Sequence, residues 1–175
     1  MGGSKPRRRT SRDLPPAAPK PAVRRLTARD LPEVVRIDAA QTGARKPAYW
    51  RRVLLDRRPP EGGARVRLAA PSRSGLAGYL IGEVRAFEFG SEPCGWVVAI
   101  AVDRGHVRTC VASALLDSAS VAFRRAGVTS VRTMVRRNDV PVLSFFRSNR
   151  FVAGAYVQLE LDLTELADTE DRHGR

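Results

Sequence analysis

Hydrophobic residues recur along the chain with two different periods, and each period predicts its own kind of element. Apolar residues three or four positions apart predict helices over residues 27–38, 47–56, 111–125 and 140–149. Alternating or short apolar runs between turn residues predict strands at 22–26, 64–70, 75–89, 94–103, 128–135 and 151–163. This order predicts an α/β (α+β) fold, with one mixed sheet and helices packed against it.

The ends and inward faces of these helices can be predicted from particular residues. Thr27 and Asp30 have the spacing of a capping box at the start of the first helix, and Gly127 stands just beyond the third. The apolar face predicted for the second helix consists of Tyr49, Trp50, Val53 and Leu54. The third helix is expected to bury Val111, Leu115, Ala119, Ala122 and Phe123.

Composition divides the chain into a core region and two polar ends. Hydrophobic residues make up 43% of the 175 residues, which is enough for a folded domain with a core. Residues 1–21 hold six basic residues and five prolines, and they are predicted to be a disordered basic arm. We expect one domain over residues 22–163 and a flexible tail over residues 164–175.

The charge balance is strongly basic, with 31 Lys and Arg against 18 Asp and Glu and a formal net charge of +13. Such a balance favours anionic ligands or polyanionic partners but does not define a fold. The basic arm is therefore predicted either to make weak contact with nucleic acid or to serve only as a solubilising tail. Arg132 and Arg136 are likewise predicted either to contact nucleic acid or to form only the solvated face of their strand, where alternation places them.

Few residues in this chain suit metal ligation, disulfide formation or membrane insertion. The chain has two cysteines and two histidines without metal-ligand spacing, so we expect no metal site and a reducing, cytoplasmic environment. No apolar run approaches the roughly 20 residues that a membrane helix needs. The first residues also lack the apolar centre of a secretion signal. We therefore expect no membrane contact, whereas monomer and homodimer remain equally compatible with the sequence.

Residues 102–116, "VDRGHVRTCVASALL", have the order of an apolar strand, a polar loop and a helix start, which suits anion binding. Together with residues 96–151, this stretch resembles the core of the GNAT superfamily of acetyl-CoA-dependent N-acetyltransferases. That family has a fourth strand ending in Val-Asp, a Q/R-x-x-G-x-G/A loop and a helix closed by Arg-Arg-x-Gly. The resemblance covers residues 22–163.

The resemblance implies a mostly antiparallel sheet with helices on both faces, in which strands four and five are parallel and splay apart near Ala101 and Met134. Acetyl-CoA would enter between these strands, and an amine would attack its thioester directly. The loop at 107–112 would cradle the pyrophosphate. The cosubstrate-binding residues implied by the resemblance are Ile100, Ala101, Val102, Val107, Arg108, Thr109, Cys110, Val111, Ala112, Ser113, Asn138, Asp139 and Phe146.

The loop departs from the family pattern at several positions. Val107 stands where the family has Gln or Arg, and Cys110 replaces the first glycine, whereas Ala112 fits the pattern. A β-carbon at Cys110 hinders close approach of a phosphate, and Arg108 offers a charge-assisted contact in compensation. Cys110 also stands at a helix start, where a cysteine is either a nucleophile with a lowered pKa or a small apolar residue.

The usual catalytic residues of the family are replaced in this sequence. Phe146 falls on the position of the tyrosine that protonates the leaving thiolate, and the base of some members falls near Trp96. Glu83 and Glu92 are the nearest carboxylates, and each is either a base acting through water or a solvated surface acid. Tyr156 is either a substitute acid or a core residue.

Three functions are compatible with these observations. The first is an N-acetyltransferase that acts mainly by positioning an unidentified amine against acetyl-CoA. The second is a GNAT-like module without catalysis that binds acyl-CoA or a macromolecular partner, favoured by the changes at Val107, Cys110 and Phe146. The third is a nucleic-acid-associated protein that uses the basic arm and residues 132–139, "RTMVRRND". Acetyl-CoA titration by calorimetry separates the first two from a chance resemblance.

Overall fold

The computed structural model describes residues 20–56, 58 and 63–164. Residues 1–19 of the predicted basic arm and residues 165–175 of the predicted tail lie outside the described residues. The chain divides into two compact units, Met1–Met134 and Val135–Arg175.

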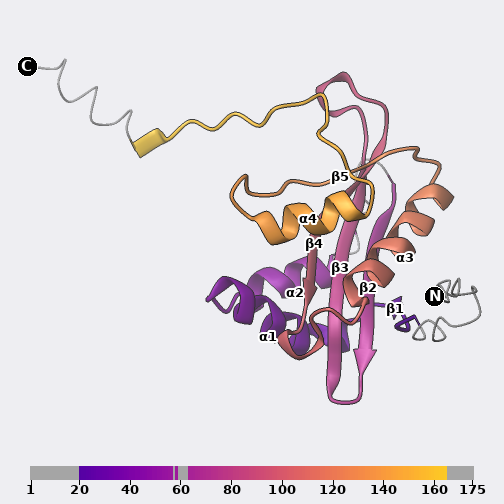
Figure 1. Ribbon diagram of the computed structural model, residues 1–175, viewed down its shortest axis with the longest axis vertical. Helices are drawn as coiled ribbons and strands as arrows, with labels where there is room; N and C mark the ends of the chain where they lie inside the picture. Colours follow the sequence, from indigo (N-terminus) through magenta and orange to yellow (C-terminus); the bar gives the residue numbers. More distant parts are fainter. Residues whose placement is uncertain (1–19, 57, 59–62, 165–175) are drawn as a thin grey trace, which may run out of the picture. The chain divides into compact units, whose positions relative to one another are not determined.

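A five-stranded sheet forms the centre of the first unit (Figure 1). Its strands follow one another in chain order: β1 (Arg24–Arg25), β2 (Arg65–Ser72), β3 (Gly75–Arg85), β4 (Cys94–Val102) and β5 (Val131–Arg132). The first three pairings are antiparallel, and β4 pairs with β5 in parallel. This arrangement confirms the expected mixed sheet with parallel strands four and five.

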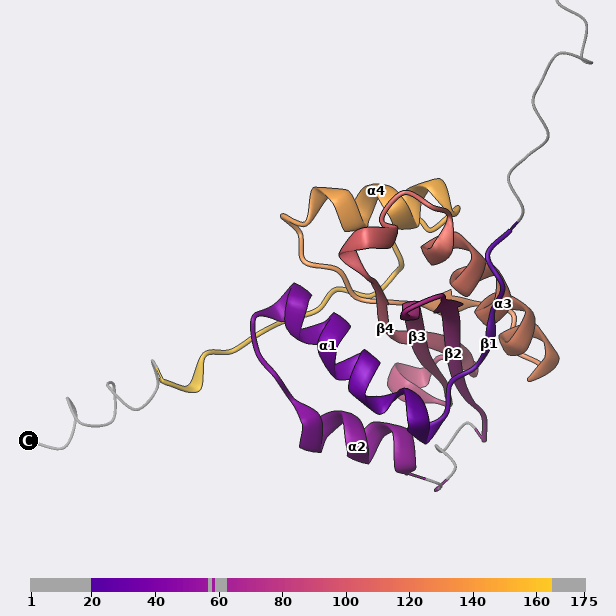
Figure 2. The same cartoon turned by 90° about the horizontal axis from the view of Figure 1, so that it is seen from below.

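Helices cover both faces of this sheet, as Figure 2 shows, which confirms the layered fold predicted from the sequence. One face carries α1 (Leu31–Thr42) and α2 (Pro47–Leu55), and the other carries α3 (Val111–Arg125). Short 3-10 turns precede α1 and follow β3 and β4: η1 (Ala28–Asp30), η2 (Glu88–Gly90) and η3 (Arg104–His106).

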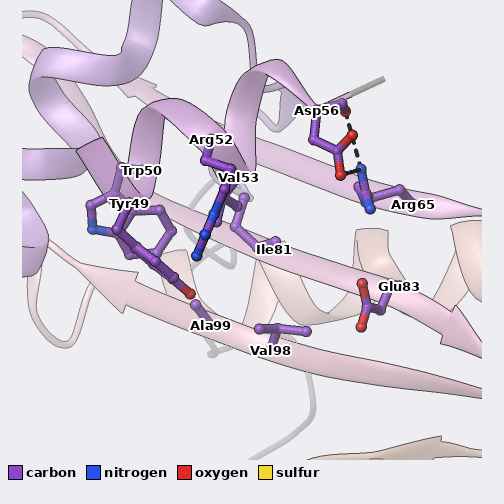
Figure 3. Close-up of a pocket in the computed structure, with 10 residues that line it drawn as sticks. All are labelled: Tyr49, Trp50, Arg52, Val53, Asp56, Arg65, Ile81, Glu83, Val98 and Ala99. Carbon is purple, nitrogen blue, oxygen red and sulfur yellow. Dashed lines mark hydrogen bonds and ion pairs between the residues drawn. The ribbon is translucent and has the colours of Figure 1, made fainter. Parts of the chain in front are cut away.

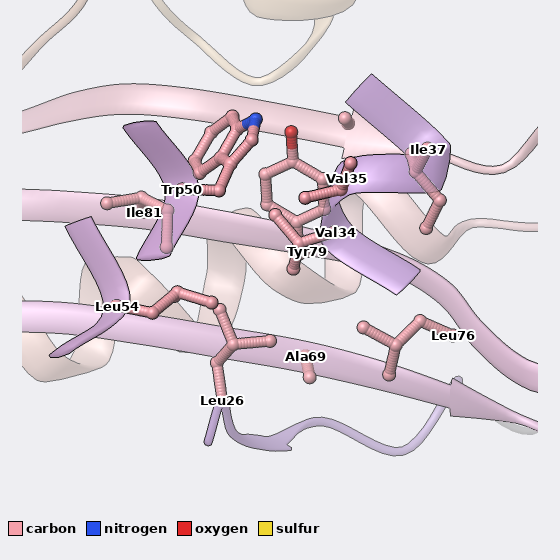
Figure 4. Close-up of a cluster of buried hydrophobic side chains, with 11 residues drawn as sticks. Leu26, Val34, Val35, Ile37, Trp50, Leu54, Ala69, Leu76, Tyr79 and Ile81 are labelled. Atoms are coloured by element: carbon pink, nitrogen blue, oxygen red, sulfur yellow. The ribbon is translucent and has the colours of Figure 1, made fainter. Parts of the chain in front are cut away.

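The core beneath α1 and α2 is built around two aromatic rings (Figure 4). Trp50 of α2 meets Tyr79 of β3 edge to face, with ring centroids 5.4 Å apart. Leu54 is buried beside them, as predicted, but Tyr49 is 40% exposed. The prediction for Tyr49 was wrong because its ring, which packs only edge-on against Trp50, borders an open pocket at the rim of this core.

On the other face, α3 packs through Phe123, which is fully buried. The ring lies directly over two glycines, Gly82 of β3 and Gly95 of β4. A β-carbon at either position would come within 2.7 Å of a ring atom. The two glycines therefore create the space in which the Phe123 side chain packs against the sheet.

A polar cluster fixes the chain between β1 and α1. The Asp30 carboxylate accepts hydrogen bonds from Arg24 Nη1 at 2.8 Å and Nη2 at 2.7 Å, and from the Thr27 N–H at 2.8 Å. The predicted pairing of Thr27 with Asp30 is thus formed. Chiefly because of the Arg24 hydrogen bonds, the pKa of Asp30 is lowered to about 2.

In the second unit, α4 (Val140–Ser148) begins at Asp139, whose side chain accepts a hydrogen bond from the Val142 N–H at 3.2 Å. Phe146 is buried, and its ring centroid lies 5.1 Å from that of Phe145 and 5.0 Å from that of Phe151. The helix predicted over residues 140–149 is thus present.

The strand predicted over residues 151–163 is absent from the described residues, so that prediction was wrong. From Val157 on, its apolar residues alternate with polar ones, but residues 152–163 are exposed and the backbone joins no ladder. A strand needs a neighbouring strand for its backbone hydrogen bonds, and alternation alone does not supply one. For the same reason β5 is shorter than the predicted range 128–135.

The contact between Phe123 and Gly95 makes a packing prediction. Gly95→Ala should destabilise the first unit by about 1–3 kcal/mol, because the added methyl group overpacks the ring. Phe123→Leu combined with Gly95→Ala should cost less than the sum of the two single changes, as measured by urea denaturation. Gly154→Ala is the control, because its β-carbon would have no atom within 4 Å. Additive effects would contradict this packing.

The cluster around Asp30 makes a pH prediction. Because folding lowers the pKa of Asp30 from 3.8 to about 2, its ionised form stabilises the folded state above pH 4. This stabilisation, about 2 kcal/mol from the size of the shift, should be lost as the pH falls from 4 to 2. Asp30→Asn should flatten the acid limb of the stability curve in that window, and Arg24→Ala should flatten part of it. Parallel curves for wild type and Asp30→Asn would contradict this assignment.

Candidate functional site

The parallel pairing of β4 with β5 is unusually short. It joins Gly95 to Val131 and Trp96 to Arg132 and then stops. At the next position the Thr133 hydroxyl donates to the Val97 carbonyl at 3.1 Å in place of a further ladder pair. The strands therefore part at Val97, earlier than the expected point near Ala101 and Met134.

A β-bulge in β4 lies where the strands part. Ile81 of β3 pairs with Ala99, and Gly82 pairs with Val97, so Val98 is an extra residue in β4. A bulge increases the local twist and bends the strand. This bend accompanies the separation of β4 from β5 and leaves Val98 partly exposed.

Beyond the bulge, alternate residues of β4 direct their backbone groups away from β3. The Asp103 N–H donates to the Ala77 carbonyl at 2.8 Å, and the register then places Ala101 in a hydrogen-bonded pair with β3. The backbone N–H and C=O groups of Ile100 and Val102 therefore face the edge of β4 that lies away from β3. The Val102 carbonyl accepts a hydrogen bond from Gln41 Nε2 at 3.1 Å. The outward N–H and C=O groups of Ile100, in contrast, have no partner among the described residues.

The loop after β4 is fastened to α1 at its base. The Asp103 carboxylate forms an ion pair with Arg36 Nη1 at 2.6 Å, and this guanidinium lowers the pKa of Asp103. Arg104 Nη2 donates to the Ala40 carbonyl, also at 2.6 Å. These contacts hold the beginning of the loop against a helix of the same unit.

The rest of the loop presents free backbone N–H groups. Within the described part of the chain, no amide from residue 107 to residue 113 has a hydrogen-bond acceptor. Arg108 and Cys110 adopt left-handed backbone conformations, with φ of +66° and +60°. Glycine is favoured in that region, so Cys110 holds a glycine-like conformation at the position where the family has glycine. Seven consecutive free amides that lead into a helix start are an arrangement suited to an anion.

The alternative role of Cys110 as a nucleophile gains no support from its surroundings. The thiol is exposed, and none of the described residues forms a hydrogen bond with it. The imidazole of His106 instead lies 3.4 Å from the Asp103 carboxylate. A base that activates a thiol has to be within hydrogen-bonding reach of it.

A pocket of about 250 Å³ lies between α2 and strands β2, β3 and β4 (Figure 3). Its apolar part includes Trp50, Val53 and Ile81, and it reaches β4 at Val98 and Ala99, next to the open edge at Ile100. The other lining residues are Tyr49, Arg52, Asp56, Arg65 and Glu83.

Glu83 lies on the pocket wall, directly opposite Trp96 in the β3–β4 register. Trp96 stands where the family base was expected, and its cross-strand neighbour Glu83 carries a carboxylate. Arg85 Nε donates to Glu83 at 3.0 Å, and the Arg85 guanidinium also lies 4.6 Å from the centroid of the Trp96 ring. These contacts fix the Glu83 side chain at the edge of the pocket.

The other candidate residues are distributed differently. Glu92 is exposed and does not line this pocket. Asn138, Asp139, Phe146 and Tyr156 belong to the second unit, where Asp139 caps α4 and Phe146 is buried among aromatic rings. The sequence therefore identified one carboxylate of the pocket, Glu83, and missed its other charged side chains.

Solved structures with the same fold are numerous, and three illustrate the range. A ribosomal-protein-alanine N-acetyltransferase from Brucella melitensis biovar Abortus 2308 is 19% identical, with a TM-score of 0.66 over 81% of this chain and 99% of that one. An aminoglycoside acetyltransferase from an uncultured soil metagenomic sample, in complex with sisomicin, is 19% identical, with a TM-score of 0.63 over 81% and 95%. The chain has the GNAT fold. The resemblance found in the sequence is thereby confirmed for the fold.

A third GNAT-fold structure carries a ligand that spans two substrates. It is AAC(6')-Iy in complex with the bisubstrate analog CoA-S-monomethyl-acetylneamine, 12% identical to this chain, with a TM-score of 0.66 over 81% and 97% of the two chains. No protein-family model and no curated protein matches the sequence. Among the described residues, no helix is long and apolar enough to cross a membrane, and no three potential ligands gather around a metal position.

Proposed function

We propose that this protein is an acetyl-CoA-dependent N-acetyltransferase that transfers an acetyl group to an amine by direct attack. The observation that carries the proposal is the open edge of β4, which leads from Ile100 into the loop of free amides at residues 107–113. An extended, amide-containing arm can pair with such an edge as an added strand would. The anionic end of the same molecule then meets the amides.

The loop suits a pyrophosphate despite its unusual sequence. Its amides are free, and Arg108 can add a charge-assisted contact to a phosphate oxygen. The left-handed backbone at Cys110 is the conformation that glycine would supply. The side chain of Cys110 restricts the approach of a phosphate, so we expect binding that is weaker than with glycine but present.

Glu83 is proposed as the group that receives the proton of the incoming amine, through a water molecule. Its carboxylate lines the pocket that reaches β4 beside the open edge. General base catalysis of this kind contributes about 10²- to 10⁴-fold to the rate. A dedicated acid is less needed, because a thiol with a pKa of about 8.5 is acidic enough to leave as the thiolate, which then takes a proton from water. Phenylalanine at position 146 is therefore compatible with turnover.

Restoring the family residues of the loop should strengthen cosubstrate binding. Cys110→Gly combined with Val107→Arg should tighten acetyl-CoA binding about tenfold, which corresponds to about 1.4 kcal/mol, as measured by calorimetry. The glycine removes the β-carbon, and the arginine adds a phosphate partner. Cys110→Ala is the matched control, because it removes the thiol but keeps the β-carbon. Equal dissociation constants for all three proteins would mean that this loop does not bind the pyrophosphate.

Removing the proposed base should slow the reaction without weakening cosubstrate binding. Glu83→Gln should lower kcat/KM for the acceptor about 100-fold, measured by thiol release, with an unchanged dissociation constant for acetyl-CoA. Glu92→Gln, at an exposed glutamate outside the pocket, should stay within twofold of wild type. Equal losses in both variants would exclude Glu83 as the base. Binding of acetyl-CoA with no thiol release for any amine would favour the non-catalytic module.

A further inference from the structure

The pocket between α2 and the sheet contains four charged side chains, and three of them have partners. Asp56 forms an ion pair with Arg65 at 3.1 Å on the pocket wall. Glu83 is held by Arg85 at 3.0 Å, and Arg85 does not line the pocket. Arg85 Nη1 also lies 3.7 Å from Glu88, so this guanidinium is shared between two carboxylates. The fourth charged side chain, that of Arg52, places a positive charge on the α2 side of the pocket.

Arg52 is available to bind a ligand. It forms no ion pair with the described residues, and its guanidinium lies 6.0 Å from the centroid of the Tyr49 ring. Figure 3 shows both side chains extending from α2 toward β4. A guanidinium beside an aromatic ring keeps its planar set of N–H donors, which matches the geometry of a carboxylate.

Glu83 reaches the same pocket from β3 (Figure 3). Its carboxylate favours a ligand group that carries a positive charge or donates hydrogen bonds, as a protonated amine does. The pocket therefore presents a cation on α2 and an anion on β3 to one ligand. A molecule that satisfies both carries an amine and an anionic group.

Size and lining restrict the ligand further. A volume of about 250 Å³ lies below the range of about 300–1,000 Å³ typical of sites for drug-sized molecules. Trp50, Val53, Ile81 and Val98 supply apolar surface between the charged side chains. The pocket thus suits one small molecule with an apolar portion.

We infer that the acceptor is a small zwitterionic amine of the amino-acid type, whose carboxylate binds Arg52 and whose amine faces Glu83. This inference rests on the proposed acetyltransferase function and names the substrate class of the same site. Polycationic amines are disfavoured, because each would bring further positive charges beside the Arg52 guanidinium, which forms no ion pair with the described residues, in a chain whose formal net charge is +13. The acceptor thus differs in charge from sisomicin, the ligand in one of the solved structures with this fold.

The test compares amines that differ in one charge. L-leucine and L-phenylalanine are assayed against their carboxamides, with spermidine and sisomicin as polycations, by thiol release from acetyl-CoA with the full-length protein. The amino acids should exceed their carboxamides in kcat/KM by at least tenfold. Arg52→Ala should remove this preference by lowering kcat/KM for the amino acids alone, and Arg52→Lys should retain part of it. Arg51→Ala, an exposed neighbour on α2 outside the pocket, should change nothing.

The outcomes separate this inference from the proposed function. A preference of the wild type for carboxamides, spermidine or sisomicin would overturn the inference and leave the acetyltransferase function standing. An equal loss for amino acids and carboxamides in Arg52→Ala would also overturn it. If acetyl-CoA fails to bind and no thiol is released, the proposed function falls, and the inference falls with it.

A binding measurement decides the case in which acetyl-CoA binds but no amine is acetylated. Calorimetric titration of L-leucine and L-phenylalanine into the protein saturated with CoA should then show binding that is lost in Arg52→Ala and kept in Arg51→Ala. That result supports the ligand class without catalysis. Absence of binding in the wild type would overturn the inference.

Discussion

The structure of the candidate site depends on one limited interaction, the two-residue parallel ladder between β4 and β5. Backbone N–H and C=O groups need partners, and a strand edge without a neighbour is a template for an extended molecule. Because the ladder stops at Trp96, and because Val98 is inserted as a bulge, the groups of Ile100 face an open edge. The free amides of residues 107–113 follow directly along the chain. A longer ladder would close the edge on which the proposed function depends.

Contacts from α1 hold this open region in place. Arg36 binds Asp103, Arg104 binds the Ala40 carbonyl, and Gln41 binds the Val102 carbonyl. They fix the beginning of a loop that also contains left-handed backbone at Arg108 and Cys110. Such conformations cost about 1–2 kcal/mol per residue outside glycine and persist where the surroundings impose them. The pocket with Arg52 and Glu83 meets β4 just before this region, so both proposed substrates converge on the same few residues of one strand.

Much of this fold could be predicted from the sequence, because hydrophobic periods and capping residues act locally. The helices, the order of the strands and the cap formed by Thr27 and Asp30 follow from such signals. The failures concern partners distant in sequence. Alternation at residues 151–163 encodes a strand conformation but no neighbouring strand, and the exposure of Tyr49 depends on where the pocket opens. Arg52 was missed because an arginine on a helix is usually solvated, and only the fold shows it bordering a pocket.

Hydrogen–deuterium exchange with and without acetyl-CoA tests the central claim most directly. In the free protein the amides of residues 107–113 lack acceptors and should exchange fast. Saturating acetyl-CoA should slow these amides and that of Ile100 at least tenfold, and it should leave the hydrogen-bonded amides of α2 unchanged. Binding of acetyl-CoA without protection at Ile100 and at residues 107–113 would contradict the account. Failure of acetyl-CoA to bind at all would contradict it as well.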